Sequence, residues 1–327
     1  RELDVTSYAE WLLGFAPDEH REFHKLFITT SDDVPERAVY ARKCLWGFAD
    51  DKGRHNNVDW PYTAFMAVSE PLKSFDCDKE SFIGLYHNDD KPQAMFEPQL
   101  AGRSGRFTDA IAALQVAVTL EPFASKTIVF TLGAAQDGQE DAGEFIRLYT
   151  STEGSERAFQ QVQAFWSRFI DTEVVETPDE ALNFMTNTWL KYQSISCRLW
   201  GKSAFYQVSA GIGFRDQLQD SQIYLISEPD YTRKQLLLHA TQQFIEGDVL
   251  HWWFSIRGGG PRTNCSDDLL WLPFILDAYL KETNDYTLLD EAVPYLNAPA
   301  EPFYEHCNRA IERSFSRFSP RCTTWTN

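Results

Sequence analysis

The sequence lacks the short motifs that mark several common classes of enzyme and membrane protein. No apolar run approaches the roughly 18 residues that a membrane-spanning helix needs, and no basic stretch followed by an apolar one opens the chain, so we expect no signal peptide. HExxH is absent, so His251 and Glu246 lack the spacing of a zinc protease. GxSxG and GxxxxGK[ST] are also absent, which removes the standard serine-hydrolase and P-loop interpretations.

Cysteine is sparse, and no pair has CxxC spacing. The 327 residues contain six cysteines, at Cys44, Cys77, Cys197, Cys265, Cys307 and Cys322. This scatter argues against a disulfide framework and against a zinc site. We therefore expect buried free thiols in a reducing, cytoplasmic compartment, with no metal and no resident cofactor.

Positive charge is also scarce, and aromatic rings are abundant. Lys and Arg number 30 against 48 Asp and Glu, which gives a formal net charge of −18. Such a chain repels nucleic acid and anionic membrane surfaces. Aromatic residues make up 14% of the chain; most of them we expect in cores, but flat rings also line sugar sites. The sequence does not start with Met, from which we expect a longer parent protein.

The first half of the sequence alternates apolar and polar residues with the period of β-strands. The clearest case is 112–133, where two alternating runs flank "EPFASK" and predict an antiparallel hairpin with one buried face. The stretches 36–47 and 62–71 are further strand candidates. Many strands separated by turn signals favour a β-sandwich.

The second half shows helical spacing instead. Thr177 is the expected N-cap of a long helix that continues to Trp200. Ser266 is the expected N-cap of a second helix over 266–285, which is apolar almost all round. Further helices are expected at 155–170, 230–246 and 303–315. We therefore predict a multidomain chain, β then α, divided into 1–154, a β-sandwich; 155–176, a helical linker; and 177–327, a helical domain.

The stretch "GFRDQLQD" combines an arginine with two aspartates directly after the small-residue run "SAGIG". If a helix begins near Phe214, then Asp216 and Asp220 share one of its faces. An arginine beside an aspartate can bind vicinal hydroxyls, because the guanidinium donates and the carboxylate accepts. The alternative is an ordinary charged helix N-terminus, where the helix dipole favours Asp.

A second polar segment, 246–273, is hard to explain by packing alone. It holds acids, arginines, His251, the pair Trp252 and Trp253, and three consecutive glycines. Functional loops have this composition, whereas the alternative is a long solvated connection.

These segments together resemble a known family. "SAFYQVSAGIGFRDQLQD", "EGDVLHWW", "RTNCSDDLLWLP" and "YEHCNRAIER" look like the inverting glycoside phosphorylases of glycoside hydrolase family 94. The forms "GFRDQLQD" and "SDDLLWLP" are most similar to the phosphorylase-like domain of cyclic β-1,2-glucan synthases. The resemblance implies a β-sandwich, a linker helix and part of an (α/α)6 barrel, which phosphorolyses β-1,2-gluco-oligosaccharides to glucose 1-phosphate.

The resemblance also assigns roles to residues. It implies substrate contacts by Arg215, Asp216, Asp220, His251, Trp252 and Trp253. It implies phosphate contacts by Arg198, Arg262 and Thr263. The expected partners are a β-glucan oligosaccharide and inorganic phosphate as co-substrate, which is already anionic and needs no general base.

The sequence departs from the family pattern at the general acid. The family places this Asp in a "GDWNDG" motif after the "YEHC" helix, and no "WND" occurs here; "WTN" at 325–327 has an amide in its place. We therefore assign no catalytic residue and expect this chain to be an inactive part of a barrel, whose exposed apolar surface would favour homo-oligomers. Three alternatives remain: a carbohydrate-binding protein without turnover, an inverting hydrolase that uses Asp216 or Asp220 as acid, and a fragment without function.

Overall fold

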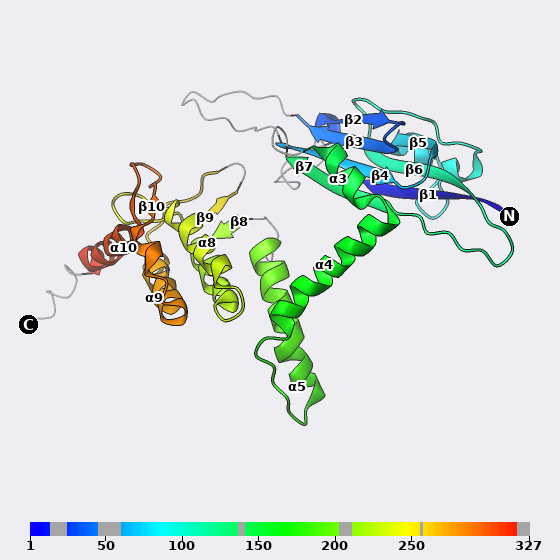
Figure 1. The fold of residues 1–327 in the computed structure, drawn as a ribbon. Coiled ribbons are helices and arrows are strands. Elements are labelled where there is room, and N and C mark those ends of the chain that lie inside the picture. Colours follow the sequence, from blue (N-terminus) through cyan, green and yellow to red (C-terminus); the bar gives the residue numbers. More distant parts are fainter. Residues whose placement is uncertain (14–24, 45–59, 137–140, 203–210, 256–257, 319–327) are drawn as a thin grey trace, which may run out of the picture. The chain divides into compact units, whose positions relative to one another are not determined.

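The computed structural model describes residues 1–13, 25–44, 60–136, 141–202, 211–255 and 258–318. They form two compact units, Arg1–Gln163, which is rich in strands, and Ala164–Asn327, which is mostly helical (Figure 1). The long helix α4, Thr152–Ile170, contains the boundary between the two units. None of the described helices is long and apolar enough to cross a membrane.

The strands of the first unit form two antiparallel sheets. The order in the first sheet is β1 (Glu2–Glu10), β6 (Ala110–Thr119) and β5 (Leu72–Asp78). The order in the second is β2 (Ile28–Asp33), β3 (Ala38–Lys43), β4 (Tyr62–Val68) and β7 (Phe130–Gln136). Val39 and Met66 of the second sheet share a buried cluster with Leu114 and Val116 of the first, so the two sheets pack as in a sandwich. The predicted strands at 36–47 and 62–71 are confirmed within the described residues.

The predicted hairpin over 112–133 is wrong. Strands occur on both sides of "EPFASK", but β6 pairs with β1 and β5, whereas β7 pairs with β4 in the other sheet. Strand β6 is buried on both faces for most of its length, because one face packs against the second sheet and the other against Phe82 and Ala94. Even Gln115 is buried, and its Oε1 accepts a hydrogen bond from Ser74 Oγ at 2.7 Å.

Short helical elements cover parts of the first unit. They are η1 (Lys25–Phe27), α2 (Lys79–Ile83), η2 (Gln93–Phe96) and α3 (Ala142–Tyr149). Phe82 anchors α2, because it is buried and stacks on Tyr8 of β1 with ring centroids 4.9 Å apart.

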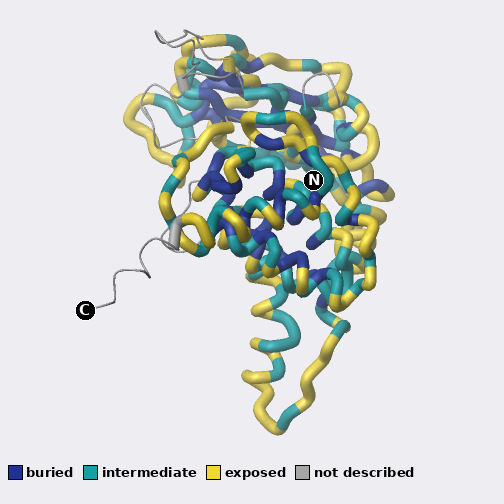
Figure 2. The backbone as a smooth tube through the Cα atoms, turned by 90° about the vertical axis from the view of Figure 1, so that its left-hand side faces the viewer, coloured by how far each residue is buried: buried dark blue, intermediate teal, exposed yellow. Residues whose placement is uncertain are grey.

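The predicted long helix that ends at Trp200 is present as one continuous helical run. Its segments are α5 (Glu180–Phe184), η3 (Met185–Trp189), α6 (Leu190–Tyr192) and η4 (Gln193–Trp200), of which η3 and η4 have π-type hydrogen bonding. The N-cap is Asp179 rather than Thr177, because the Asp179 carboxylate accepts hydrogen bonds from the amides of Ala181 and Leu182. The segments α5, η3 and α6 contain no buried residue, and Figure 2 shows that stretch as exposed or half-buried along its length.

The remaining elements form a compact helical body. They are β8 (Gly211–Gly213), α7 (Phe214–Asp220), η5 (Ser221–Tyr224), α8 (Pro229–Ala240), β9 (Trp252–Phe254), η6 (Asp268–Leu270), α9 (Trp271–Thr283), η7 (Tyr286–Asp290), β10 (Ala292–Val293), β11 (Glu301–Pro302) and α10 (Phe303–Phe318). Helix α8 ends six residues before the predicted 246. Helix α9 begins after the turn η6 rather than at Ser266.

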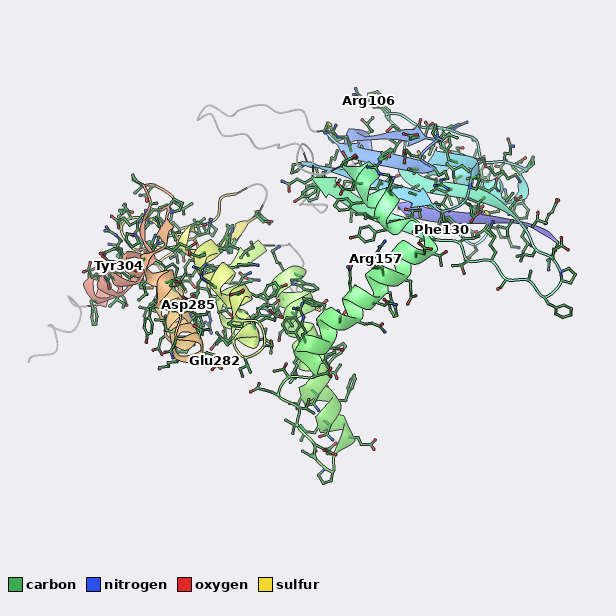
Figure 3. All side chains as sticks on the ribbon, in the orientation of Figure 1. Arg106, Phe130, Arg157, Glu282, Asp285 and Tyr304 are labelled. Atoms are coloured by element: carbon green, nitrogen blue, oxygen red, sulfur yellow. The ribbon has the colours of Figure 1, made fainter. Side chains whose placement is uncertain are left out.

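The core of this body gathers side chains from α7, α8, α9 and α10, among them Phe214, Leu236, Ile275 and Phe303. Helix α9 is not buried all round as predicted, because Phe274 remains 57% exposed. Figure 3 shows Asp285 just after α9, where its carboxylate accepts hydrogen bonds from the Tyr279 hydroxyl at 2.8 Å and the Thr287 amide at 3.1 Å.

Candidate functional site

The two-stranded ribbon of β8 and β9 separates a core face from an accessible face. Ile212 pairs with Trp253, and Gly213 pairs with Trp252. Because cross-strand partners point to the same side of a sheet, the tryptophan pair is split between the two faces. Trp253 is 3% exposed and packs edge-on against His239 and Phe214 in the core. The prediction that Trp253 contacts substrate is therefore wrong, because its ring has no free face.

Trp252 lies on the accessible face, opposite a residue without a side chain. Its ring meets Phe254 edge-on, with centroids 5.3 Å apart. A Cβ on Gly213 would stand 3.1 Å from Oδ2 of Asp216, so the Asp216 side chain packs directly against this glycine. Because Gly213 is the cross-strand partner of Trp252, Asp216 lies on the same side of the ribbon as Trp252.

The helix α7 brings Asp216 and Asp220 to the same face, as predicted, and both meet Arg198 of η4. Arg198 Nε donates to Asp220 Oδ2 at 2.8 Å, and its Nη2 lies 3.8 Å from Asp216 Oδ2. Burial raises the pKa of Asp220, and the neighbouring Arg198 opposes that rise. The site is therefore one cation between two carboxylates.

Arg215 does not pair with Asp216, contrary to the prediction of a clamp formed by these two residues. Its Nη1 donates to Asp267 Oδ2 at 3.1 Å, and its guanidinium lies over the Trp271 ring, 5.3 Å from the centroid. Consecutive helical residues do not face each other, so Arg215 and Asp216 reach different partners. The guanidinium that serves Asp216 is that of Arg198.

Gln217 holds this arrangement in place, although no role was predicted for it. Its Oε1 accepts a hydrogen bond from the Gly213 amide at 2.5 Å, and its Nε2 donates to the Arg198 carbonyl at 3.4 Å. A buried amide on α7 thus links β8 to η4. The only signal in the sequence was a glutamine between the two aspartates.

His251 is oriented by a buried carboxylate. Its Nδ1 lies 2.6 Å from Oδ2 of Asp268, whose other oxygen is buried and has no hydrogen-bond partner among the residues that the structure describes. Cys265 completes a His, Cys and Asp group whose ligand atoms lie within 4.8 Å of one another. The His251–Asp268 contact has the length of a hydrogen bond. It holds the ring so that Nε2 points away from Asp268, and the absence of a metal stays a prediction.

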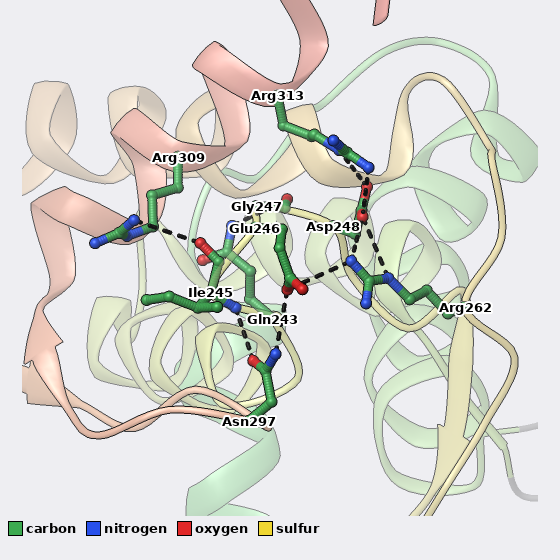
Figure 4. A network of polar contacts seen from close by, with 9 residues as sticks. All are labelled: Gln243, Ile245, Glu246, Gly247, Asp248, Arg262, Asn297, Arg309 and Arg313. Atoms are coloured by element: carbon green, nitrogen blue, oxygen red, sulfur yellow. Dashed lines mark hydrogen bonds and ion pairs between the residues drawn. The ribbon is translucent and has the colours of Figure 1, made fainter. Parts of the chain in front are cut away.

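Arg262 belongs to a different network, which is centred on Asp248 (Figure 4). Asp248 is 2% exposed, and its carboxylate accepts from Arg262 Nη2 at 2.5 Å and from Arg313 Nε at 3.0 Å. The Arg262 guanidinium also lies 4.1 Å from the Phe244 ring centroid. Arg262 is thus paired with carboxylates in this structure, and its predicted phosphate contact stays a prediction.

The other two predicted phosphate ligands, Arg198 and Thr263, make contacts outside the Asp248 network. Thr263 Oγ1 accepts a hydrogen bond from the Cys265 amide at 3.3 Å, which stabilises the turn before η6. Arg198 is paired with two carboxylates. Phosphate binding by Arg198 and Thr263 stays a prediction.

His239 beneath the ribbon makes the helical unit sensitive to acid. Burial against Trp253 and Phe214 lowers the pKa of His239 from 6.5 to about 4. Between these values the unfolded chain binds a proton that the folded chain does not, so the free energy of unfolding falls as the pH falls, by up to about 1.4 kcal/mol per pH unit. We expect His239→Gln to reduce the loss of stability between pH 7 and pH 5, measured by urea unfolding at both values. His306, whose pKa burial also lowers, accounts for the slope that remains; an unchanged slope in the variant would contradict the assignment to His239.

Comparison with known proteins agrees with this order of units. Two domain profiles of one family match: the glycosyl hydrolase 94 supersandwich domain over residues 1–152, and the catalytic domain of the glycosyl hydrolase 94 superfamily over residues 165–324. The chain belongs to glycosyl hydrolase family 94, which confirms the resemblance seen in the sequence.

Its relatives include a synthase and several phosphorylases. The chain is 33% identical to the cyclic beta-(1,2)-glucan synthase NdvB of Rhizobium meliloti (strain 1021), over 97% of this chain and 11% of the relative. It is 27% identical to the solabiose phosphorylase of Paenibacillus borealis, over 96% of this chain and 38% of the relative. It is 25% identical to the N,N'-diacetylchitobiose phosphorylase of Vibrio proteolyticus, over 80% of this chain and 36% of the relative. The chain therefore spans only a part of these proteins.

Proposed function

We propose that this chain forms the β-sandwich and part of an (α/α)6 barrel of a protein of the β-glucan phosphorylase class, and that its helical unit binds a β-1,2-linked gluco-oligosaccharide. The likeness to both a cyclic glucan synthase and disaccharide phosphorylases supports a glycoside as ligand. Inorganic phosphate is the proposed co-substrate, without a resident cofactor.

The observation that carries this proposal is that Trp252 and the Arg198–Asp216 pair lie on one side of the ribbon at the start of α7. Vicinal sugar hydroxyls need an acceptor and a donor side by side, and the carboxylate and guanidinium supply both. The apolar face of a sugar ring needs a flat apolar surface, which Trp252 supplies on the accessible side of the ribbon. Gly213, which has no side chain, lets the Asp216 carboxylate lie against the ribbon.

The proposed reaction is phosphorolysis with inversion. A phosphate oxygen forms a bond to the anomeric carbon, the bond from that carbon to the glycosidic oxygen breaks, and an acid gives its proton to the departing oxygen. Arg198 at 2.8 Å favours the charged form of Asp220, whereas burial raises the pKa of Asp220 and favours its protonated form. No Trp-Asn-Asp sequence occurs in the 327 residues. We therefore propose that they bind glucan without turnover.

Substituting the two adjacent tryptophans separately tests the proposal. Trp252→Ala should weaken binding of a β-1,2-linked glucotriose by about threefold to tenfold, the value of one aromatic contact, with an unchanged melting temperature. Trp253→Ala should instead destabilise the fold by about 3–5 kcal/mol, because it empties a core position. Titration calorimetry and urea unfolding measure the two effects.

A coupled assay for glucose 1-phosphate, run on the same proteins with phosphate present, should show no product. Phosphate-dependent formation of glucose 1-phosphate by this chain would refute the absence of turnover. If both variants still bind the trisaccharide as the unchanged protein does, the proposed sugar site is wrong.

A further inference from the structure

The β-sandwich unit carries a groove that the site above does not use. A hollow of about 500 Å³ lies on one side of the end of α2, and a second hollow of about 390 Å³ lies on the other. Both are lined by Glu80, Gly84 and Leu85, so the two hollows are neighbours that share these residues as a border. We call the two neighbouring hollows the α2 groove.

One half of the α2 groove presents aromatic rings to solvent. Tyr86 is 97% exposed and Phe107 is 74% exposed, and both line the larger hollow. Both residues have positive φ, 69° and 67°, a conformation that costs a residue with a side chain about 1–2 kcal/mol. Because both rings are exposed, burial of these side chains does not offset the conformational cost. Two exposed rings beside one hollow are the features that stack on the apolar faces of sugar rings.

The other half of the groove is polar. Gln93, Gln99 and Glu97 line the smaller hollow, together with Arg103. Arg103 Nη1 donates to Asp78 Oδ2 at 3.0 Å, so a guanidinium and a carboxylate again stand side by side. Amides, carboxylates and a guanidinium offer both donors and acceptors to hydroxyl groups.

Gly84 brings the two halves together. It has a φ of +84°, and a Cβ at this position would stand 2.5 Å from Oε1 and 2.6 Å from Cβ of Gln93. The glycine therefore lets Gln93 of η2 lie directly against the end of α2. Because Phe82 anchors α2 to the sheet below, the groove has a firm base and does not need to form on binding.

We propose that the α2 groove binds a gluco-oligosaccharide, separately from the site in the helical unit; the choice of glucan rests on the proposed function. An oligosaccharide carries apolar ring faces and hydroxyls on one chain, and it matches both halves at once. A second copy of this chain, docked through Tyr86 and Phe107, would bury the two rings. The polar side chains of the other half would then lose their hydrogen bonds to water without gaining defined protein partners, which is unfavourable.

The experiment uses the full chain with Asp216→Ala, which weakens the helical site. A β-1,2-linked glucohexaose is titrated into this protein and into the same protein with Tyr86→Ala and Phe107→Ala. We expect the two ring substitutions to weaken the remaining binding at least tenfold. The matched control is Phe123→Ala, because Phe123 is also fully exposed with a positive φ of 65° but lines neither hollow. It should leave binding unchanged.

Three outcomes overturn the proposal. If Asp216→Ala alone abolishes hexaose binding, the groove is not a site, although the proposed function stands. If hexaose binding persists equally with and without Tyr86 and Phe107, another surface holds the sugar. If sedimentation shows a dimer that is lost with the two rings while sugar binding is unaffected, the groove is an interface between copies. Melting temperatures, which these exposed substitutions should not change, identify a folding defect.

Discussion

Replacing Asp248 by alanine is expected to lower the free energy of unfolding of the helical unit by about 3 kcal/mol. The carboxylate is buried and accepts from Arg262 and Arg313 at 2.5–3.2 Å. Without it, the Arg313 and Arg262 guanidiniums lose a shared counter-charge, although Glu246 remains 3.4 Å from Arg262 Nη2. Each remains about one-third exposed, so water recovers part of the loss and the effect falls at the lower end of the range for broken buried pairs.

The loss should extend to α10, because Arg313 is the contact that links this helix to Asp248. Urea unfolding followed by tryptophan fluorescence measures the change. Asp277→Ala is the matched control, because Asp277 is exposed and its ion pair to Lys281 spans one helical turn; such a pair contributes about 0.3–0.5 kcal/mol. Equal effects of the two substitutions would show that the Asp248 network does not stabilise the fold.

Replacing Asp216 by alanine is expected to weaken glucan binding by the helical site about 10- to 100-fold, because a hydrogen bond to a charged group contributes about 1.5–3 kcal/mol. Titration of a β-1,2-linked glucotriose into the chain that carries Tyr86→Ala and Phe107→Ala isolates this site. Stability should hardly change, since Asp216 is half-exposed and stands 3.8 Å from Arg198.

The control for this prediction is Asp230→Ala. Asp216 and Asp230 each lie in the first turn of a helix, α7 and α8 respectively, so both favour their helix through its dipole. Asp216 packs against Gly213, the cross-strand partner of Trp252, and lies 3.8 Å from Arg198. If both substitutions leave binding intact, Asp216 is an ordinary residue of a helix N-terminus and the proposed sugar site loses its main acceptor.

Local sequence patterns predicted where the helices and strands lie better than they predicted which strands pair and which side chains meet. The spacing of apolar residues located α4, and the period-two alternation located β6 and β7. Strands β3 and β4 lie within, and helix α10 overlaps, other segments that the sequence predicted as strand or helix. The pairing of β6 with β1 and β5 could not be predicted, because alternation records which side chains are buried and not which strand lies alongside. The cap of the long helix differed by two residues because Thr177 and Asp179 are both good N-caps.

The sequence by itself determined the family, through long ordered motifs, and it determined that Asp216 and Asp220 share a face, through the helical period. Only the tertiary structure decided that Arg198, and not Arg215, serves these carboxylates. It also decided that Trp252 is accessible whereas Trp253 is core. The physical reason is that helical and strand periods set the direction of each side chain within its own element. What a side chain meets in that direction depends on segments distant in sequence, here η4 and the partner strand of the ribbon.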